Sequence, residues 1–329
     1  MRNLPQRAVQ LTYIFALAVA VGPGPASAQK RATPSAVDMT QMIAVQVGLD
    51  RAGFSPGEID GRGGPKTRLA LSEFQKSAGL EPTGAVSEET LASLGRGAEP
   101  IVSYTISEQD AAGPFIDAMP SDMMESAKLS ALGYTSALEA LAERFHASPV
   151  LLKTLNPGAT WGAGEAIKVP AVEPFEAPVK GATLPAGAKP AAAAGAEVVI
   201  TGANRSLVVR DAGGKVLMYA PVTIGSSKDP LPVGDWKVLS VSWNPTFNYN
   251  PDLFWDADPT HAKAKIPPGP NNPVGIVWVD INKEHFGLHG TPEPSTVGRT
   301  ESHGCIRLTN WDAARLGHLV GAGTKVTIQ

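Results

Sequence analysis

The chain has 329 residues, of which 43% are hydrophobic and 18% are charged, and its formal net charge is -3. This length predicts two or three domains with ample core. The nearly balanced charge leaves no basic footprint for a nucleic acid. The single cysteine, Cys305, excludes an internal disulfide.

Residues 1–28 have the pattern of a secretory signal peptide. Arg2 and Arg7 precede an apolar run at residues 11–21, and Ala26-Ser27-Ala28 forms an A-x-A cleavage site. The run is shorter than the ~20 residues that span a bilayer. We therefore expect a secreted, periplasmic protein that starts at Gln29 and has no stable membrane anchor. An uncleaved N-terminal anchor is the alternative.

Residues 38–96 predict a small module of three short helices. Asp38 is a capping residue for the first helix, Pro65 opens the second and Ser87 caps the third. The apolar residues expected to face inward are Met42, Val45, Leu49, Leu71, Phe74, Ala78, Leu91 and Leu94. The phrase GEIDG at residues 57–61, with Phe74-Gln75 and Gly79-Leu80, is similar to a three-helix peptidoglycan-binding module. A helical spacer that binds nothing, with Asp60 only a turn residue, is the alternative.

Residues 99–172 predict a second, α/β module. Residues 101–106 alternate like a strand, residues 136–146 and a stretch from Pro149 predict helices, and residues 167–170 predict a closing strand. This order resembles a LysM domain, a sugar-binding fold. An insertion between Ser107 and Tyr134 departs from that pattern. Residues 173–195, rich in Pro, Ala and Gly, predict a linker.

Residues 196–329 predict a mainly β domain with one helix, so the whole chain is expected to be a multidomain α+β protein. The expected strands are residues 198–200, 206–210, 216–219, 236–241, 275–279, 287–289, 305–308 and 326–328. The helix is expected at residues 310–319, with Asn310 as a capping residue. An aromatic, proline-rich loop at residues 244–272, which includes Tyr249 and Trp255, is expected either to cover Cys305 or only to pack against itself.

Cys305 is the candidate nucleophile of this last domain. A thiol has an ordinary pKa near ~8.5, so it needs a nearby imidazole or positive potential to react at neutral pH. His303 and His289 are close in sequence, and Gly304 allows the backbone to approach a substrate oxygen. Two other interpretations stay open: a buried cysteine that only fills space, and a zinc site. The zinc ligands would be His285, His289, His303 and Cys305.

The pattern His289-Gly290, followed by Ser302-His303-Gly304-Cys305-Ile306-Arg307, resembles the signature of the L,D-transpeptidases with a YkuD domain. The resemblance covers about the last third of the chain and implies the YkuD-type β-sandwich, with Cys305, His289 and His303 as catalytic residues. Gly304, Gly290 and Ser302 are expected to shape and orient the site, with the His289 ring held by a backbone carbonyl such as that of Gly290. Arg307, Tyr249 and Trp255 are the expected substrate-binding residues, although Arg307 in a structural salt bridge is the alternative. No cofactor or metal is expected.

The resemblance also implies a reaction. Cys305 would attack the carbonyl of the third residue of a peptidoglycan stem tetrapeptide and release the terminal D-Ala. Transfer of the acyl group to a second stem would then give a 3-3 cross-link. The resemblance thus implies a cell-wall-associated protein whose expected partners are peptidoglycan stem peptides and glycan. Carbapenems are expected to acylate the thiol. With water as acceptor the enzyme would be an L,D-carboxypeptidase or amidase, and with a protein acceptor it would attach that protein to the wall. A non-catalytic wall-binding protein is the remaining alternative.

Overall fold

The structure is a computed structural model that describes residues 38–95, 97–177, 193 and 195–329. The predicted signal peptide and most of the predicted linker therefore lie outside the described residues. No helix in the described part of the chain is long and apolar enough to cross a membrane.

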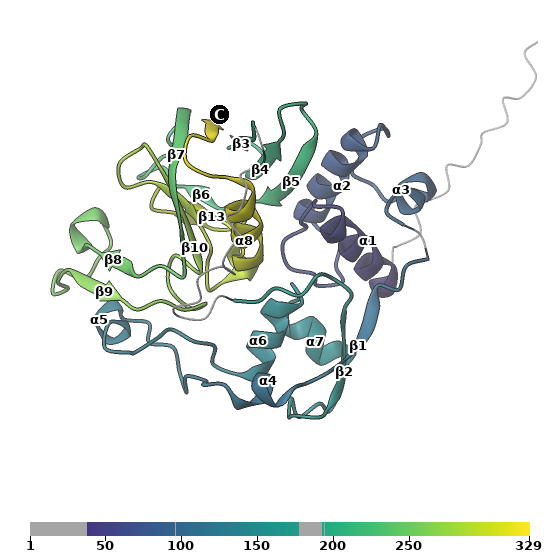
Figure 1. Cartoon of the computed structure of the whole chain (residues 1–329), viewed down its shortest axis with the longest axis horizontal. Coiled ribbons are helices and arrows are strands. Elements are labelled where there is room, and N and C mark those ends of the chain that lie inside the picture. The colour runs from purple at the N-terminus through teal and green to yellow at the C-terminus, as the bar shows by residue number, and fades with distance from the viewer. Residues whose placement is uncertain (1–37, 96, 178–192, 194) are drawn as a thin grey trace, which may run out of the picture. The chain divides into compact units, whose positions relative to one another are not determined.

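The N-terminal region has the three predicted helices, drawn in purple and blue in Figure 1. They are α1 (Met39–Arg51), α2 (Pro65–Ser77) and α3 (Glu88–Ser93). The Asp38 carboxylate accepts from the N–H of Gln41 at 2.7 Å, and the Ser87 hydroxyl accepts from that of Thr90 at 3.1 Å, so both predicted caps are confirmed. Ala78 was expected to be buried, but it is exposed because α2 ends one residue before it.

The turn after residue 57 also behaves as expected from its sequence. One oxygen of the Asp60 carboxylate accepts from Nε2 of Gln46 and from the backbone N–H of Arg62, both at 2.9 Å. The first bond ties the turn to α1 and the second stabilises the turn itself. Asp60 thus stabilises this turn, and whether the module binds glycan stays a prediction.

The middle region contains the predicted order of strand, two helices and strand. These elements are β1 (Ile101–Thr105), α6 (Ala137–Arg144), α7 (Pro149–Leu155) and β2 (Ala166–Pro170), and β1 pairs antiparallel with β2. The likeness to a LysM domain stays a prediction. The insertion holds two short helices, α4 (Glu108–Ala112) and α5 (Met123–Ser126). The first residues of the predicted linker are packed, because Phe175 is buried and its N–H donates to the carbonyl of Arg144 at 2.7 Å.

The C-terminal region is built on an eight-stranded sheet in the order β13-β11-β10-β7-β14-β3-β4-β5. Its strands are β3 (Glu197–Thr201), β4 (Ser206–Arg210), β5 (Val216–Pro221), β7 (Gly234–Trp243), β10 (Val277–Ile281), β11 (Gly287–His289), β13 (Ile306–Arg307) and β14 (Lys325–Ile328). The long strand β7 joins two halves, since residues 234–237 pair with β14 and residues 238–243 pair with β10. The two halves share one apolar core, in agreement with the expected mainly β domain.

Helix α8 (Asn310–Leu319) packs into this core through Trp311, Ala313 and Leu316. Its N-cap is Thr309 and not Asn310 as expected, because the Thr309 hydroxyl accepts from the N–H of Asp312 at 3.2 Å. The asparagine is thereby released for contacts outside the helix.

Helix α8 is also the place where all three regions of the chain meet. The Ser55 hydroxyl of the N-terminal region donates to Asp312 at 2.8 Å. From the middle region, the His146 ring stacks on Trp311 with ring centroids 5.1 Å apart. Both contacts join the regions directly, without the predicted linker.

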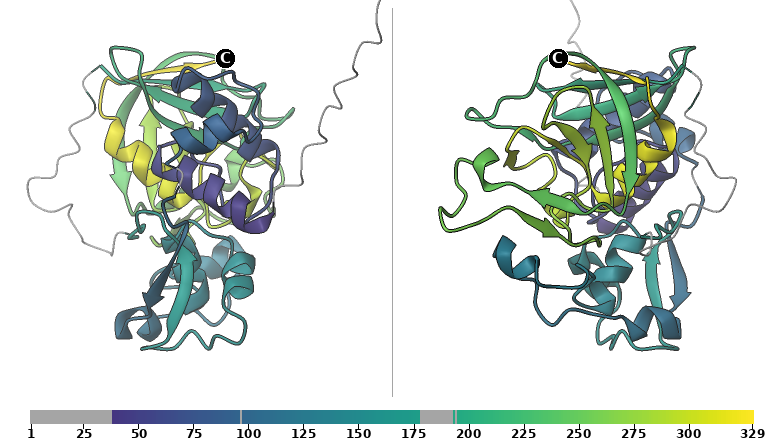
Figure 2. Two further views of the ribbon diagram at one scale, coloured as in Figure 1. Left: turned by 90° about the vertical axis from the view of Figure 1, so that its right-hand side faces the viewer. Right: turned by 60° about the vertical axis from the view of Figure 1, so that its left-hand side comes forward.

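The aromatic loop is a hairpin. Strands β8 (Phe247–Tyr249) and β9 (Ala264–Ile266) pair antiparallel, with the short 3-10 helix η1 (Pro251–Leu253) in the segment that connects them. Figures 1 and 2 both show α5 of the middle region beside β9, and residues of the two elements are in contact.

Candidate active site

Cys305 lies immediately before β13, at an edge of the large sheet. Strand β13 runs parallel to β11, with Leu288 opposite Ile306 and His289 opposite Arg307. Leu288 and Ile306 point into the core. Because side chains alternate along a strand, Cys305, Arg307 and His289 lie on the other face, where all three line one cavity.

The turn that presents the thiol is fixed by its neighbours. The Ser302 hydroxyl donates to the carbonyl oxygen of Cys305 at 2.5 Å. Gly304 has φ +101°, and a Cβ at this position would lie 2.6 Å from Cε1 of Phe286. Only glycine adopts this backbone conformation at low cost and leaves room for the ring. Ser302 and Gly304 thus hold Cys305 in place.

His289 is oriented by the backbone, as the sequence predicts. Its Nδ1 lies 2.6 Å from the carbonyl oxygen of Gly290. A carbonyl only accepts, so Nδ1 carries the proton and Nε2 keeps its lone pair. The ring also stacks on Trp278, with centroids 5.4 Å apart. Burial and the charge of Arg307 lower the pKa of His289 to about 3, which keeps the imidazole neutral.

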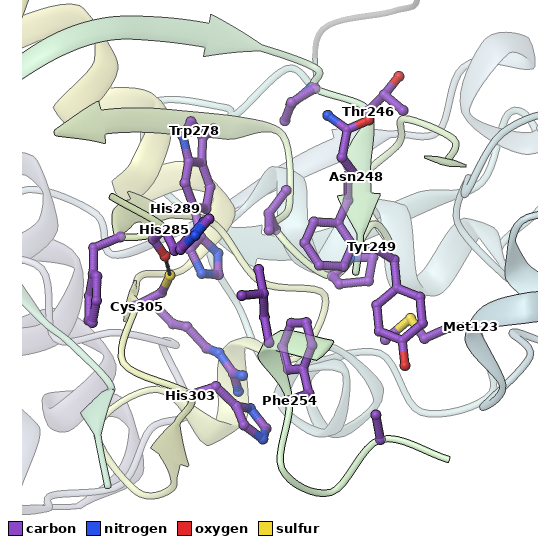
Figure 3. Close-up of a pocket in the computed structure, with 18 of the residues that line it drawn as sticks. Met123, Thr246, Asn248, Tyr249, Phe254, Trp278, His285, His289, His303 and Cys305 are labelled. Carbon is purple, nitrogen blue, oxygen red and sulfur yellow. Dashed lines mark hydrogen bonds between the residues drawn. The ribbon is translucent and has the colours of Figure 1, made fainter. Parts of the chain in front are cut away.

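The thiol of Cys305 is protonated in this environment. Burial raises the pKa of Cys305, and the backbone N–H of Gly287 and the charge of Arg307 offset that effect only in part. The thiol donates to the carbonyl oxygen of His285, with sulfur and oxygen 3.7 Å apart. Figure 3 shows Cys305 beside His289 and His285 at one end of the cavity. A neutral thiol therefore faces the same space as a neutral imidazole.

Arg307 takes part in none of the ion pairs among the described residues, so the structure shows no salt bridge there. Burial lowers the pKa of Arg307 and the charge of Glu293 acts in the opposite direction, but a guanidinium remains protonated in proteins. A guanidinium that lines a cavity is suited to bind a carboxylate through two parallel hydrogen bonds.

His303 points away from the thiol, toward the hairpin connection. Its Nε2 lies 2.8 Å from a carboxylate oxygen of Asp256, and its ring makes an edge contact with Phe254 at 5.0 Å between centroids. The structure thus brings His303 into the cavity lining but ties it to the segment between β8 and β9.

The two aromatic residues expected to bind substrate have different positions. Tyr249 is buried, lines the cavity and makes a hydrogen bond with Nδ1 of His261 at 2.9 Å. Trp255 is 56% exposed and is not among the lining residues. It donates to Asp229 at 2.9 Å, and the ammonium of Lys228 lies 3.4 Å from its ring centroid. The centroids of the Trp255 and His303 rings also lie 5.6 Å apart, so Trp255 contacts two residues of the cavity lining, Asp229 and His303, without lining the cavity itself.

The cavity has a volume of about 860 Å³, enough for a peptide segment. It extends from Cys305 past Phe254 to Tyr249 and Met123 (Figure 3). Outside the strand ladders, the described hydrogen bonds leave the backbone N–H groups of Gly304 and Cys305 unused. These N–H groups are candidates for an oxyanion site.

The four residues weighed as zinc ligands do not form a metal-binding group. Within the described ranges, no group of three or more His, Cys, Asp or Glu side chains is arranged to hold a metal ion. His285 lies 3.4 Å from Glu284, and His303 is bound to Asp256.

Several residues of the site have no signature in the sequence. Trp278, Phe286 and Met123 reach the cavity from β10, from the residue before β11 and from the insertion. Their positions depend on strand pairing and on contacts over more than 100 residues of sequence, which a local pattern does not show. The one available signal was the departure of the insertion from the pattern of its module.

Comparison with protein-family models gives two matches. Residues 195–328 match the "L,D-transpeptidase catalytic domain" family, and residues 39–94 match the "Putative peptidoglycan binding domain" family.

Comparison with individual proteins gives similar names. The chain is 27% identical over 195 residues to the "Putative L,D-transpeptidase YkuD" of Bacillus licheniformis, an alignment that covers 58% of this chain and 92% of the relative. It is 30% identical over 135 residues to the "Probable L,D-transpeptidase YbiS" of Escherichia coli K12, which covers 39% of this chain and 43% of the relative. Among solved structures, an L,D-transpeptidase from Mycobacterium smegmatis aligns with a TM-score of 0.34 and 23% identity, over 41% of this chain and 59% of that one.

Proposed function

We propose that the chain, whose residues 195–328 match an L,D-transpeptidase catalytic domain and whose residues 39–94 match a peptidoglycan-binding domain, is an enzyme that forms 3-3 cross-links through a thioester on Cys305. The acyl donor is a stem tetrapeptide of peptidoglycan and the acceptor is the amine of a second stem. The single observation that carries this proposal is that Cys305 and the buried, neutral His289 line the same cavity.

The first step is acylation of Cys305. The thiol loses its proton to Nε2 of His289, and sulfur forms a bond with the carbonyl carbon of the third stem residue. The N–H groups of Gly304 and Cys305 stabilise the oxyanion. The bond to the terminal residue then breaks, and D-Ala leaves as an amine that takes the proton from His289. No external oxidant, reductant or metal is needed for this balance.

The second step resolves the thioester. The neutral amine of a second stem attacks the thioester carbon and gives its proton to His289. The carbon–sulfur bond breaks, sulfur recovers that proton, and an amide bond joins the two stems. Arg307 binds a carboxylate of a stem in this scheme, which uses the guanidinium in the cavity.

His303 contributes through the hairpin connection. Its bond to Asp256 supports the proposal that it keeps this segment over the site, in addition to the expected part in shaping the oxyanion site next to Gly304. Carbapenems, which mimic the acyl donor, are proposed to acylate Cys305.

The proposed place of action is the cell wall outside the cytoplasmic membrane. The match of residues 39–94 to a peptidoglycan-binding family supports binding to the wall, and the N-terminal sequence supports secretion with cleavage before Gln29. N-terminal sequencing of the protein purified from its native host checks the cleavage, and Met1 at the N-terminus would contradict it.

The acceptor decides between transfer and hydrolysis. Incubation with a disaccharide-tetrapeptide, with and without a second stem, distinguishes them by mass spectrometry of the products. We expect released D-Ala and a stem dimer when the second stem is present. Tripeptide alone under both conditions would show an L,D-carboxypeptidase and overturn the transfer.

A further inference from the structure

The insertion in the middle region lies between the two ranges that match protein families. It is nevertheless in direct contact with the hairpin segment of the catalytic region. The N–H of Leu132 donates to the carbonyl of Pro268 at 2.9 Å, and the N–H of Asn271 donates to the carbonyl of Leu132 at 3.0 Å. Gly269 has φ +146°, and a Cβ there would lie 2.1 Å from the Leu132 carbonyl oxygen. The backbone of residues 268–271 is thus built to accept the insertion.

A chain of side-chain hydrogen bonds makes the same connection. One oxygen of Asp122 caps α5 by accepting from the N–H groups of Met124 and Glu125, at 2.7 and 3.0 Å. Its other oxygen lies 3.0 Å from Nε2 of His261, and Nδ1 of His261 lies 2.9 Å from the Tyr249 hydroxyl. One ring tautomer satisfies both bonds, because Nε2 donates to the carboxylate while Nδ1 accepts from the phenol.

Apolar contacts complete the junction. Leu132 from the insertion is buried with Tyr249 and Ile266 of the hairpin, and Met123 and Phe254 pack against this cluster. Met123 also lines the cavity that contains Cys305. Figure 3 shows Met123 and Tyr249 together, at the side of the cavity away from the thiol.

We propose that residues 116–134 form a wall of the substrate-binding site. Asp122 and His261 hold the hairpin over Cys305, and Met123 binds an aliphatic part of the stem peptide away from the reacting carbonyl. Met123 from the wall and Phe254 and Tyr249 from the hairpin make this side of the cavity apolar, which sets this preference. The inference rests on the proposed function for the identity of the ligand. It goes beyond that function in making a segment outside the catalytic domain a determinant of substrate binding.

Met123→Ala tests the wall. Loss of the contact weakens ground state and transition state alike, so we expect KM for the stem donor to rise about 5- to 10-fold while kcat changes less than about twofold. The rate of Cys305 alkylation by iodoacetamide, which is too small to reach Met123 from the thiol, should stay the same. Glu125→Ala is the matched control, because Glu125 lies in the same helix and is paired only with exposed Lys128.

Asp122 tests the connection to the hairpin. Asp122→Ala removes the cap of α5 and the bond to His261, so we expect the alkylation rate to rise at least about threefold and KM to rise with it. Asp122→Asn should restore both to within about twofold, because an amide still caps a helix and still makes a hydrogen bond to the imidazole. Thermal unfolding of each variant shows whether the fold is retained.

The inference fails if Met123→Ala and Asp122→Ala match Glu125→Ala in both KM and alkylation rate. It also fails if Asp122→Asn is as impaired as Asp122→Ala, since the effect would then not come from these hydrogen bonds. If the unmodified protein turns over no stem peptide, the proposed function is wrong. The alkylation rates of the Asp122 variants, which need no substrate, still decide the connection to the hairpin.

Discussion

Nδ1 of His289 lies 2.6 Å from the carbonyl oxygen of Gly290, and this contact leaves Nε2 as the ring nitrogen that can accept a proton. The peptide oxygen orients the ring in place of a carboxylate. Because a carbonyl carries no full negative charge, it stabilises an imidazolium less than a carboxylate would. In the proposed mechanism the base is therefore neutral at rest, and the thiol proton is transferred only when the substrate is bound.

The first prediction concerns the pH dependence of the thiol. With the pKa of His289 at about 3 and that of Cys305 raised, no imidazolium–thiolate pair exists at neutral pH. The alkylation rate of Cys305 should thus rise about tenfold per pH unit from pH 6 to above pH 8. Iodoacetamide kinetics across this range measure it. A plateau between pH 5 and pH 7 would show a preformed ion pair instead.

The second prediction separates the two histidines. His289→Ala removes the general base, so the burst of D-Ala released on acylation should slow by about 10²- to 10⁴-fold. His303→Ala loses the bond to Asp256 and the ring contacts with Phe254 and Trp255, so acylation should slow by about tenfold or less. Rapid quench with a stem tetrapeptide measures both rates. The reverse order of effects would exchange the two roles.

The third prediction concerns the turn at Gly304. Gly304→Ala places a methyl group against Phe286 at φ +101°, so we expect a loss of roughly 2–4 kcal/mol in the free energy of unfolding. Gly323→Ala is the control, because φ is +91° there and nothing lies within 4 Å of the added Cβ. It should cost about 1 kcal/mol. Denaturant titrations compare the two, and equal losses would show that the Phe286 ring moves aside freely.

The sequence was sufficient for residues whose role depends on local pattern. Cys305, the His289–Gly290 contact and the three N-terminal helices were predicted because a cap, a periodicity or a short motif specifies each of them. The order of elements in the middle region was predicted for the same reason.

Residues whose role depends on distant contacts were not predictable. Asn310 looked like a helix cap, but Thr309 takes that role, and the Asn310 side chain instead donates to Glu143 at 3.0 Å. Trp255 is expected from the sequence to bind substrate, but its side chain does not line the cavity and its indole N–H donates to Asp229, on the loop before β7. Met123 lies in a segment with no recognisable pattern. In each of the three cases, the position of the side chain depends on a residue far away in the sequence or on a neighbour that takes the expected role instead.

The fourth prediction uses the buried junction between the middle and catalytic regions. Oε1 of Glu143 accepts from Asn310 at 3.0 Å and from the Tyr134 hydroxyl at 3.1 Å, and burial raises the pKa of Glu143 to about 8. A raised pKa means that the folded protein holds a proton that the unfolded chain releases near pH 4.5. The contribution of Glu143 to the free energy of unfolding is therefore fully present below pH 4.5 and is lost as the pH rises through 8.

Glu143→Gln keeps the accepting oxygen but does not ionise. We expect the variant to match the unmodified protein near pH 5 and to exceed its free energy of unfolding by on the order of 1–3 kcal/mol at pH 9. Exposed Glu125→Gln should show no such pH dependence. Thermal unfolding at both pH values measures it, and an unchanged difference between pH 5 and pH 9 would show that Glu143 is ionised throughout.

The central claim is that Cys305 forms a thioester with the acyl donor, and intact-protein mass spectrometry after rapid mixing with a stem tetrapeptide tests it most directly. We expect the unmodified protein to gain the mass of the donor minus D-Ala, and to gain the mass of imipenem when that carbapenem replaces the stem. Cys305→Ser keeps the shape but has a far less acidic hydroxyl, so both adducts and the stem dimer should disappear. An adduct on a residue other than Cys305, or a dimer formed by Cys305→Ser at a comparable rate, would contradict the account.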